Sequence, residues 1–388
     1  MDGAAGLPIP AFGNRTSLEI ASTPNLDNLA KQSQLGMVTT VPQGMEPSSA
    51  IACMSVMGYD PLVYYKGRAA IEATSLDIPI EEDEAVFRCN LVNTDGGIMR
   101  SYCAGHISTD EAVELVNALN AALGNDRISF YPGTGYRHIL KLKGYNETLE
   151  AVTTPPHDIS NLPIASYLPR GKGSEELLKL IEKSKIVLKN HPVNMRRHSE
   201  NKITADSIWL TWGSGQPPKL PPFSEVYGKT AAITSGVDLL RGLGKMMSME
   251  VLDIPGVTDD QNNDCAAQTS GAIKALDRHD LVFIHFEAPD EAGHAGSLEQ
   301  KMGAIEKADR EMVRMLVEYL GTTGRLLIMP DHPTPIELFT HTSDPVPYLI
   351  WGKDITPGEG NRFTETEAGK SGLVFNPGWK IMKHFIEG

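Results

Sequence analysis

The strongest constraint on the fold is a regular alternation of short apolar runs and amphipathic stretches from about residue 203 onward. The apolar runs have the length of buried strands, and the stretches between them carry apolar residues at three- and four-residue spacing, which is typical of helices packed on a sheet. The runs are 208–212, 231–234, 249–252, 281–286, 326–329 and 346–351. This alternation predicts an α/β fold with a doubly wound, mainly parallel sheet.

Residues 76–200 follow a different pattern and are predicted to form an inserted α+β cap domain. Ser108 and Glu111 form the capping-box pattern of a helix that runs to Gly124, and a strand with alternating polarity is expected at 136–142. Residues 1–75 resume the style of the C-terminal part. We therefore expect one discontinuous domain over 1–75 and 201–388, interrupted by the cap over 76–200.

The N-terminal residues resemble the end of a strand that leads into a loop. Asp2 and Gly3 have the character of such a transition, yet no apolar run precedes them. The sequence therefore suggests that the sheet lacks its first strand.

Composition limits the classes of partner. The 388 residues, 41% of them hydrophobic, are enough for about two domains. The formal net charge is −14, from 49 acidic and 35 basic residues, and no basic run is present. Such a balance repels nucleic acid and anionic membranes, so we expect a small-molecule partner and neither of these polyanions. Oligomeric state cannot be deduced from these features.

The cysteines and the hydropathy pattern predict a cytoplasmic protein. Four scattered cysteines, at positions 53, 89, 103 and 265, form no CxxC pair and are too sparse for a disulfide scaffold. No apolar run reaches the roughly 18 residues that a membrane helix needs, and the N-terminus has no basic stretch followed by an apolar one.

Five potential metal ligands follow buried strands in the C-terminal part. Asp290 and His294 stand four residues apart after the run 281–286, so one helical turn brings both side chains to the same face. Asp331 and His332 follow the run 326–329, and His341 comes nine residues after His332. Ligand sites of open α/β sheets lie at the carboxyl ends of strands. A lone histidine would more often be an ordinary surface or core residue, but this combination predicts a site for divalent metal ions.

A metal site of this kind needs a nucleophile, and the start of a predicted helix offers one. Ser48 or Ser49 stands where the amides of the first helical turn also favour a phosphate group. The alternative is that either serine is only an N-cap. Asp2 can supply a further carboxylate ligand.

Several motifs together resemble the archaeal-type cofactor-independent phosphoglycerate mutases of the alkaline phosphatase superfamily. The resemblance spans nearly the whole chain and rests on the order and spacing of short motifs. These are Asp2-Gly3, the loop that ends in Ser49, Gly58-Tyr59-Asp60-Pro61, Gly67-Arg68, residues 104–108, residues 287–294 and Asp331-His332. It implies a metal-binding phosphatase-like domain with an inserted substrate domain.

The resemblance also implies a distribution of ligands between two metal ions. One ion is held by Asp290, His294 and His341, and the other by Asp2, Asp331, His332 and the nucleophilic serine. Counting back from Gly58 places that serine at Ser49. The family commonly has Gly-Ser-Asp where this chain has Ser48-Ser49-Ala50, so Ser48 remains a second candidate. Mn²⁺ is the expected ion, Mg²⁺, Zn²⁺ and Co²⁺ are alternatives, and no 2,3-bisphosphoglycerate is required.

The anionic ends of a phosphoglycerate need cationic partners, for which the guanidinium group is well shaped. Arg68, Arg137 and Arg197 are candidates, and the last two lie in segments that resemble family motifs. His106 resembles a substrate-contacting histidine of the family. For each arginine, a solvated surface position is the competing interpretation.

The resulting hypothesis is a glycolytic isomerase that interconverts 3-phosphoglycerate and 2-phosphoglycerate through a phosphoserine intermediate. Two other functions compete with it. A phosphotransferase related to homoserine kinases would keep the fold and the metals but change the acceptor, and the departures at Ser48 and Ala50 are compatible with it. A non-catalytic binding module would require broken metal ligands, whereas the ligands are present.

Overall fold

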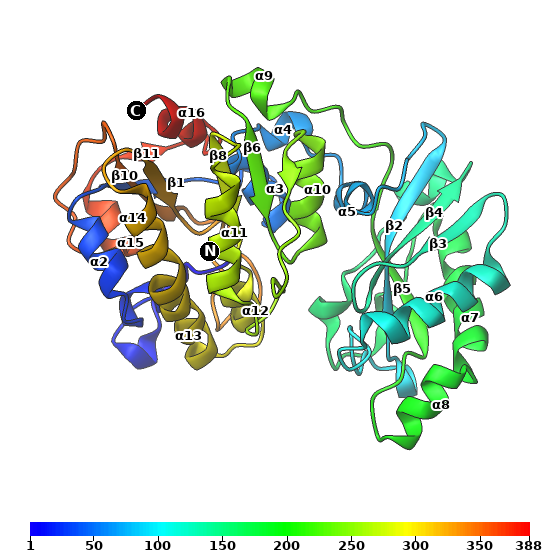
Figure 1. Ribbon diagram of the computed structural model, residues 1–388. Helices are drawn as coiled ribbons and strands as arrows, with labels where there is room; N and C mark the ends of the chain where they lie inside the picture. The colour runs from blue at the N-terminus through cyan, green and yellow to red at the C-terminus, as the bar shows by residue number, and fades with distance from the viewer. The chain divides into compact units, whose positions relative to one another are not determined.

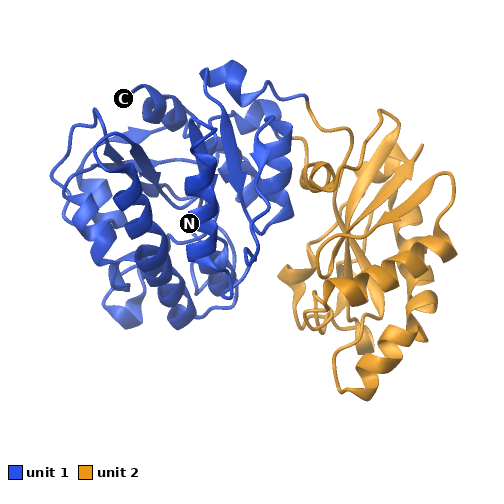
Figure 2. Cartoon of the chain, viewed as in Figure 1, with its two compact units in different colours: residues 1–65, 219–388 blue, residues 66–218 orange.

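The computed structural model describes residues 1–388, which form two compact units (Figure 2). Unit 1 comprises residues 1–65 and 219–388, and unit 2 comprises residues 66–218. The inserted unit therefore starts before residue 76 and ends after residue 200, contrary to the expected boundaries. The reason is that α5 (Arg68–Ser75) packs its alanines against Val86, and β5 (Ser207–Ser214) pairs with β2 (Glu84–Val92).

Unit 2 is an α+β unit built on one antiparallel sheet. Its strand order is β3-β4-β2-β5, with β3 at Ile128–Tyr131 and β4 at Arg137–Lys143. The helices α6 (Thr109–Leu123) and α7 (Ser174–Lys189) supply leucines to the core beneath the sheet, and α8 (Pro192–Ser199) follows (Figure 1). Ser108 caps α6 as expected, accepting a hydrogen bond from the amide of Glu111. The run 208–212, assigned above to the α/β domain, belongs to this sheet.

Unit 1 has two sheets, so the expectation of one mainly parallel sheet is wrong. The strands β7 (Glu250–Val251), β6 (Ala231–Thr234) and β8 (Leu281–Ile284) form a parallel sheet. A second sheet has the order β11-β1-β10-β9, in which β10 runs antiparallel to both neighbours. Its strands are β11 (Val374–Phe375), β1 (Gln34–Val38), β10 (Val346–Gly352) and β9 (Arg325–Ile328). The fold class is therefore mixed α/β, with parallel and antiparallel pairs.

Helices lie on both sheets of unit 1 (Figure 1). The helical segment between residues 298 and 320 contains a π-helical turn, Asp309–Val313. The α-helices of this unit are α1 (Ser17–Ile20), α2 (Pro24–Ala30), α3 (Ser49–Val56), α4 (Pro61–Tyr64), α9 (Phe223–Tyr227), α10 (Asp238–Met246), α11 (Cys265–Ala275), α12 (Ala288–His294), α13 (Leu298–Ala308), α14 (Arg314–Leu320), α15 (Glu365–Lys370) and α16 (Lys380–Glu387). No helix combines the length and the apolar character that crossing a bilayer requires.

The two sheets of unit 1 are separated by a slot. β8 pairs only with β6, and β9 pairs only with β10. At one end the N-terminal residues bridge the two sides, because the amine of Met1 donates to the carbonyl of Met329 at 3.2 Å and the amide of Asp2 donates to that of Phe286 at 2.9 Å. Beyond them is a cavity of about 540 Å³, lined by apolar side chains of β8, β9 and α14. The slot thus presents the unpaired edges of two strands beside an apolar cavity.

We expect an added N-terminal segment to fill this slot. Six apolar residues with high strand propensity, fused before Met1, would pair with the free edges of β8 and β9 and cover side chains that are only half-buried. The extension should raise the thermal midpoint of unit 1 by roughly 4 °C or more, since each kcal/mol shifts the midpoint by about 2–4 °C in a domain of this size. The control is an extension of equal length with proline at alternate positions. Because proline has no N–H group, this extension can donate hydrogen bonds to only one of the two strand edges. Equal midpoints for the two extended chains in a calorimetric scan would contradict the expectation.

Candidate metal centre

Asp290, His294 and His341 converge on one point in unit 1. Asp290 and His294 lie on α12, four residues apart, and His341 comes from the loop after β9. The Nε2 atom of His294 is 3.2 Å from Oδ2 of Asp290, and Nε2 of His341 is 3.5 Å from Oδ1 of the same carboxylate. The ligand atoms of the three residues lie within 4.8 Å of one another. The first predicted ligand set is therefore assembled in space.

Hydrogen bonds to the Nδ1 atoms of His294 and His341 orient the two rings so that Nε2 faces the Asp290 carboxylate. Nδ1 of His294 lies 2.9 Å from the carbonyl of Phe339, and Nδ1 of His341 lies 3.3 Å from that of Pro47. A carbonyl only accepts hydrogen bonds, so each Nδ1 carries a proton and each neutral ring has its lone pair on Nε2. These two Nε2 atoms are 2.9 Å apart and face a carboxylate. Two lone pairs and a carboxylate at this spacing attract a positive charge, either a metal ion or a proton. Without a metal the charge is a proton, since burial would lower the pKa of His294 but the Asp290 carboxylate raises it to about 10.

Asp2, Ser49, Asp331 and His332 form the adjoining group. Nε2 of His332 is 3.5 Å from Oδ1 of Asp2, 3.3 Å from Oδ2 of Asp331 and 3.2 Å from Oγ of Ser49. Asp331 is oriented by amides, since Gly3 and His332 both donate to its Oδ1. The ligand atoms of Asp2, Asp290 and His332 also lie within 4.8 Å of one another, so the two groups are contiguous.

The two candidate serines differ in their surroundings. Ser49 is the first residue of α3 and its hydroxyl contacts His332. Ser48 is the N-cap residue, yet its side chain caps no amide, and its buried Oγ has no hydrogen-bond partner. The geometry favours Ser49 as the serine that faces the metal ligands.

The charges of the centre also call for cations. Burial and the neighbouring carboxylates of Asp331, Glu287 and Asp290 raise the pKa of Asp2 well above its usual value. Burial would raise the pKa of Asp290 too, but the imidazoles of His294 and His341 hold it well below its usual value. Burial lowers the pKa of His332 to about 4, which keeps the ring neutral as a metal ligand must be. The Oδ1 atom of Asp2 is buried without a hydrogen-bond partner.

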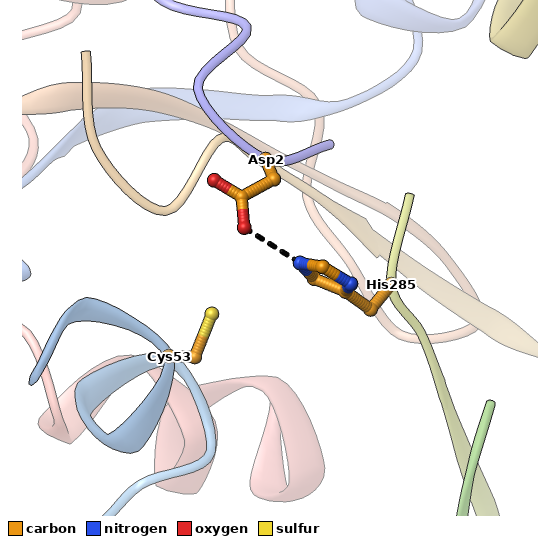
Figure 3. A group of neighbouring side chains, drawn as sticks. All are labelled: Asp2, Cys53 and His285. Carbon is orange, nitrogen blue, oxygen red and sulfur yellow. Dashed lines mark hydrogen bonds and ion pairs between the residues drawn. The ribbon is translucent and has the colours of Figure 1, made fainter. Parts of the chain in front are cut away.

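Sequence reasoning missed several residues around the centre. His285 follows β8, and its Nε2 lies 2.6 Å from Oδ2 of Asp2 (Figure 3). Cys53 stands one helical turn after Ser49 on α3, with its Sγ 3.4 Å from Oδ2 of Asp331. Thr334 contacts both Asp290 and His332 through its hydroxyl. The sequence contained signals for two of these residues, because His285 comes at the end of a buried strand and Cys53 lies on the same helix face as Ser49.

Lys301 is a buried cation that ties two ligand-bearing segments together. Its Nζ donates to the carbonyls of Ala5 and Thr334, at 3.0 and 2.6 Å. Ala5 follows Asp2, and Thr334 follows His332. The side chain is 1% exposed, and burial lowers its pKa to about 8.

Replacing Lys301 by methionine should remove a pH dependence of stability. Between pH 8 and 10.5 the unfolded lysine binds a proton that the folded lysine has released, so this group stabilises the fold increasingly as pH rises. We expect the unfolding free energy of the wild type, relative to Lys301→Met, to increase by roughly 1 kcal/mol from pH 7.5 to 9. Urea titrations of both chains would measure this difference. A difference that does not change with pH would show that Lys301 titrates normally.

The predicted arginines Arg68 and Arg137 lie in unit 2, near an arginine that was not predicted. Arg88 is buried on β2 and donates to Glu72, as does Arg68 at 2.8 Å. The guanidinium of Arg68 also stacks on Trp212, 4.2 Å from the ring centroid. Burial lowers the pKa of Arg88, and the charges of Arg68 and Arg137 add to this effect. Arg68 and Arg88 share the Glu72 carboxylate, and Arg137 lies close enough to Arg88 to affect its pKa, so this part of the sheet is favourable for an anion.

Arg197 and His106, the other two predicted contacts, belong to a different part of unit 2. Arg197 is 3% exposed, pairs with Glu111 at 2.6 Å and donates to the carbonyls of Ile203 and Ala104, each at 2.8 Å. Its donors are thus used to hold the loop before His106, which favours a structural role over substrate binding. His106 itself is exposed and adopts a positive φ of 50°.

Comparisons with known proteins show the family of this chain. The family model described as 2,3-bisphosphoglycerate-independent phosphoglycerate mutase matches residues 30–194. A relative of that name from Methanosarcina acetivorans is 45% identical over 376 residues, which cover 96% of this chain and 94% of the relative. The chain belongs to this family of mutases. Another mutase of the same name, from Methanothrix thermoacetophila, is 43% identical and covers 100% of this chain and 98% of its own.

Solved structures also resemble this mutase. A protein from Pyrococcus horikoshii superposes with a TM-score of 0.81 at 27% identity, covering 100% of this chain and 94% of that one. A cofactor-independent phosphoglycerate mutase from Thermoplasma acidophilum has a TM-score of 0.61 at 23% identity, with coverage of 100% and 97%. The latter similarity supports the fold alone.

Proposed function

We propose that this mutase interconverts 3-phosphoglycerate and 2-phosphoglycerate through a phosphoserine at Ser49. The observation that carries the proposal is the position of the Ser49 hydroxyl, 3.2 Å from Nε2 of His332 and at the first turn of α3. The amides of that turn and the positive end of the helix favour a phosphate group there. The names of the relatives favour this function over a homoserine kinase-like activity.

Two divalent ions fit the donor sets of unit 1. Asp290, His294 and His341 would hold one, and Asp2, Ser49, Asp331 and His332 the other. Mn²⁺ is our first choice, because carboxylate donors suit it, while the imidazoles also suit Zn²⁺, and Mg²⁺ and Co²⁺ are further candidates. When bound, such ions lower the pKa of a coordinated hydroxyl and screen the charge of a phosphate dianion.

The reaction then needs two phosphoryl transfers. In the first, a bond forms between Oγ of Ser49 and the phosphorus, the bond from phosphorus to the 3-oxygen of glycerate breaks, and the proton of Ser49 passes to that oxygen. In the second, the 2-hydroxyl attacks the phosphoserine, loses its proton and releases Ser49, which regains one. The 8% exposure of Ser49 limits access of water, which would otherwise hydrolyse the intermediate.

We further propose that unit 2 is the substrate domain and unit 1 an alkaline-phosphatase-like domain. Arg68, Arg88 and Arg137 can bind the anionic groups of phosphoglycerate, since planar guanidinium groups match carboxylate and phosphate oxygens. The exposed His106 is a further candidate contact. The four cysteines are free and buried, which fits a reducing compartment such as the cytoplasm.

The proposal is tested by following 3-phosphoglycerate with ³¹P NMR. After removal of bound metal and addition of Mn²⁺ in small amounts, we expect a 2-phosphoglycerate resonance to grow without added 2,3-bisphosphoglycerate. A parallel sample with homoserine and ATP should give no phosphohomoserine. Turnover of homoserine without isomerisation of phosphoglycerate would replace the mutase by a kinase-like enzyme.

A further inference from the structure

A third group of potential metal ligands lies beside the two sets described above. Asp2, Cys53 and His285 come from three elements, the N-terminal segment, α3 and the end of β8, and Figure 3 shows their side chains directed toward one another. Their ligand atoms lie within 4.8 Å of one another. Asp2 and Cys53 are 1% and 5% exposed, so the group is not a chance cluster of surface side chains.

The donors of this group differ in kind from those of the other two. A thiol sulfur joins a carboxylate oxygen and an imidazole nitrogen, a combination that suits Zn²⁺ and other thiophilic ions, whereas Mg²⁺ prefers oxygen donors. Donors that bind one zinc ion at about 2.0–2.3 Å lie roughly 3.3–3.8 Å apart. Side-chain movements of about an ångström would therefore bring the three atoms to binding distance.

His285 is already oriented for such a role. Its Nδ1 lies 2.9 Å from Oγ of Ser235, and this hydroxyl also accepts a hydrogen bond from the amide of Val237. The contact fixes the plane of the ring, so Nε2 faces Asp2 at 2.6 Å. Hydrogen bonds from outside are the usual means by which proteins orient histidine ligands.

Asp2 can serve this group and the neighbouring one at the same time. Its Oδ2 faces His285, while its Oδ1 lies 3.5 Å from Nε2 of His332 and has no hydrogen-bond partner. The two oxygens of one carboxylate thus point to two sets of ligands. The group also has an entry path, because Asp2, Cys53 and His285 line the cavity of about 540 Å³ between β8 and β9.

We propose that Asp2, Cys53 and His285 form a third metal site, selective for a thiophilic divalent cation such as Zn²⁺. Binding forms a bond between Sγ of Cys53 and the ion, and the thiol proton passes to solvent. The site shares Asp2 with the predicted dinuclear centre. An excess of a thiophilic ion therefore competes for a carboxylate that the centre uses.

Cobalt spectroscopy of the full chain tests the site without reference to activity. Co²⁺ added to the metal-free protein should produce a sulfur-to-cobalt charge-transfer band in the near ultraviolet. The band should disappear in Cys53→Ser and weaken in His285→Gln. It should persist in Cys103→Ser, a matched control whose thiol lies 3.4 Å from Ser101 in unit 2.

The outcomes separate this site from the proposed function. Sγ of Cys53 also lies near Asp331 of the dinuclear centre, but His285 belongs to neither of the other two ligand sets. A band that needs both Cys53 and His285 therefore reports on this site and not on the dinuclear centre or on mutase activity. Absence of the band in the wild type, or its persistence in Cys53→Ser, would overturn the proposal. Should Cys53→Ser fail to fold, as judged by circular dichroism, the ¹¹³Cd chemical shift of the cadmium-loaded wild type decides instead. A thiolate ligand moves the cadmium resonance far downfield of that of a site with only oxygen and nitrogen donors.

Discussion

Replacement of Ser49 by alanine is expected to abolish isomerisation, lowering kcat by roughly 10⁴-fold or more. Loss of the nucleophile in a covalent mechanism has effects of this size, because no other group can form the intermediate. Alanine retains the helix start and is a good helix former, so the fold should be preserved. The measurement is the rate of 2-phosphoglycerate formation at saturating Mn²⁺, together with a thermal scan to verify folding.

Ser48→Ala is the matched control for this prediction. Ser48 caps no amide of α3 and its hydroxyl has no partner, so truncation removes no hydrogen bond. We expect a change in kcat below about tenfold, because Ser48 takes no part in the proposed chemistry. Stability should also change little, since removing a helix cap usually costs only ~1 kcal/mol even where the cap bond exists. Activity that survives in Ser49→Ala and disappears in Ser48→Ala would assign the nucleophile to the other serine.

Asp290→Asn should have the second largest effect, through loss of bound metal. The carboxylate faces both His294 and His341, and its ligand atoms lie near those of Asp2 and His332 as well. A neutral amide of the same shape removes the negative charge that balances a cation. We expect at least one metal ion fewer per chain by mass spectrometry of bound metal, and a fall in kcat of about 10³-fold or more.

Glu291→Gln provides a comparison for Asp290→Asn. Glu291 is the next residue of α12 and carries the same charge, but it belongs to none of the ligand groups. The Glu291→Gln variant should keep the metal content and most of the activity of the wild type. If both variants lost the same amount of metal, the loss would reflect the net charge of the helix rather than coordination by Asp290.

Four of the candidate metal ligands could be found from sequence because their positions are local. Asp331 and His332 follow an apolar run directly, and Asp290 and His294 share one helical turn, so strand ends and helical spacing were enough to bring them together. His285 escaped notice because it lies inside a run that was interpreted only as buried strand. Cys53 was interpreted as one of four isolated thiols.

The arrangement of strands could not be predicted in the same way, because pairing is non-local. The run 208–212 has the apolar character of a core strand in any sheet, and only its pairing with β2 places it in unit 2. The antiparallel course of β10 likewise leaves no trace in its apolar composition. Arg88 was missed for a related reason, since a buried arginine inside the strand 84–92 becomes meaningful only with Arg68 and Glu72 beside it.

The most direct test of the central claim is to look for the phosphoserine itself. The metal-loaded enzyme would be mixed with 3-phosphoglycerate, quenched in acid within milliseconds, digested and examined by mass spectrometry. We expect a phosphate on the peptide that contains Ser48 and Ser49, with fragment ions that place it on Ser49, and none in Ser49→Ala. Full isomerase activity with Ser49 unmodified in every quenched sample would contradict the mechanism.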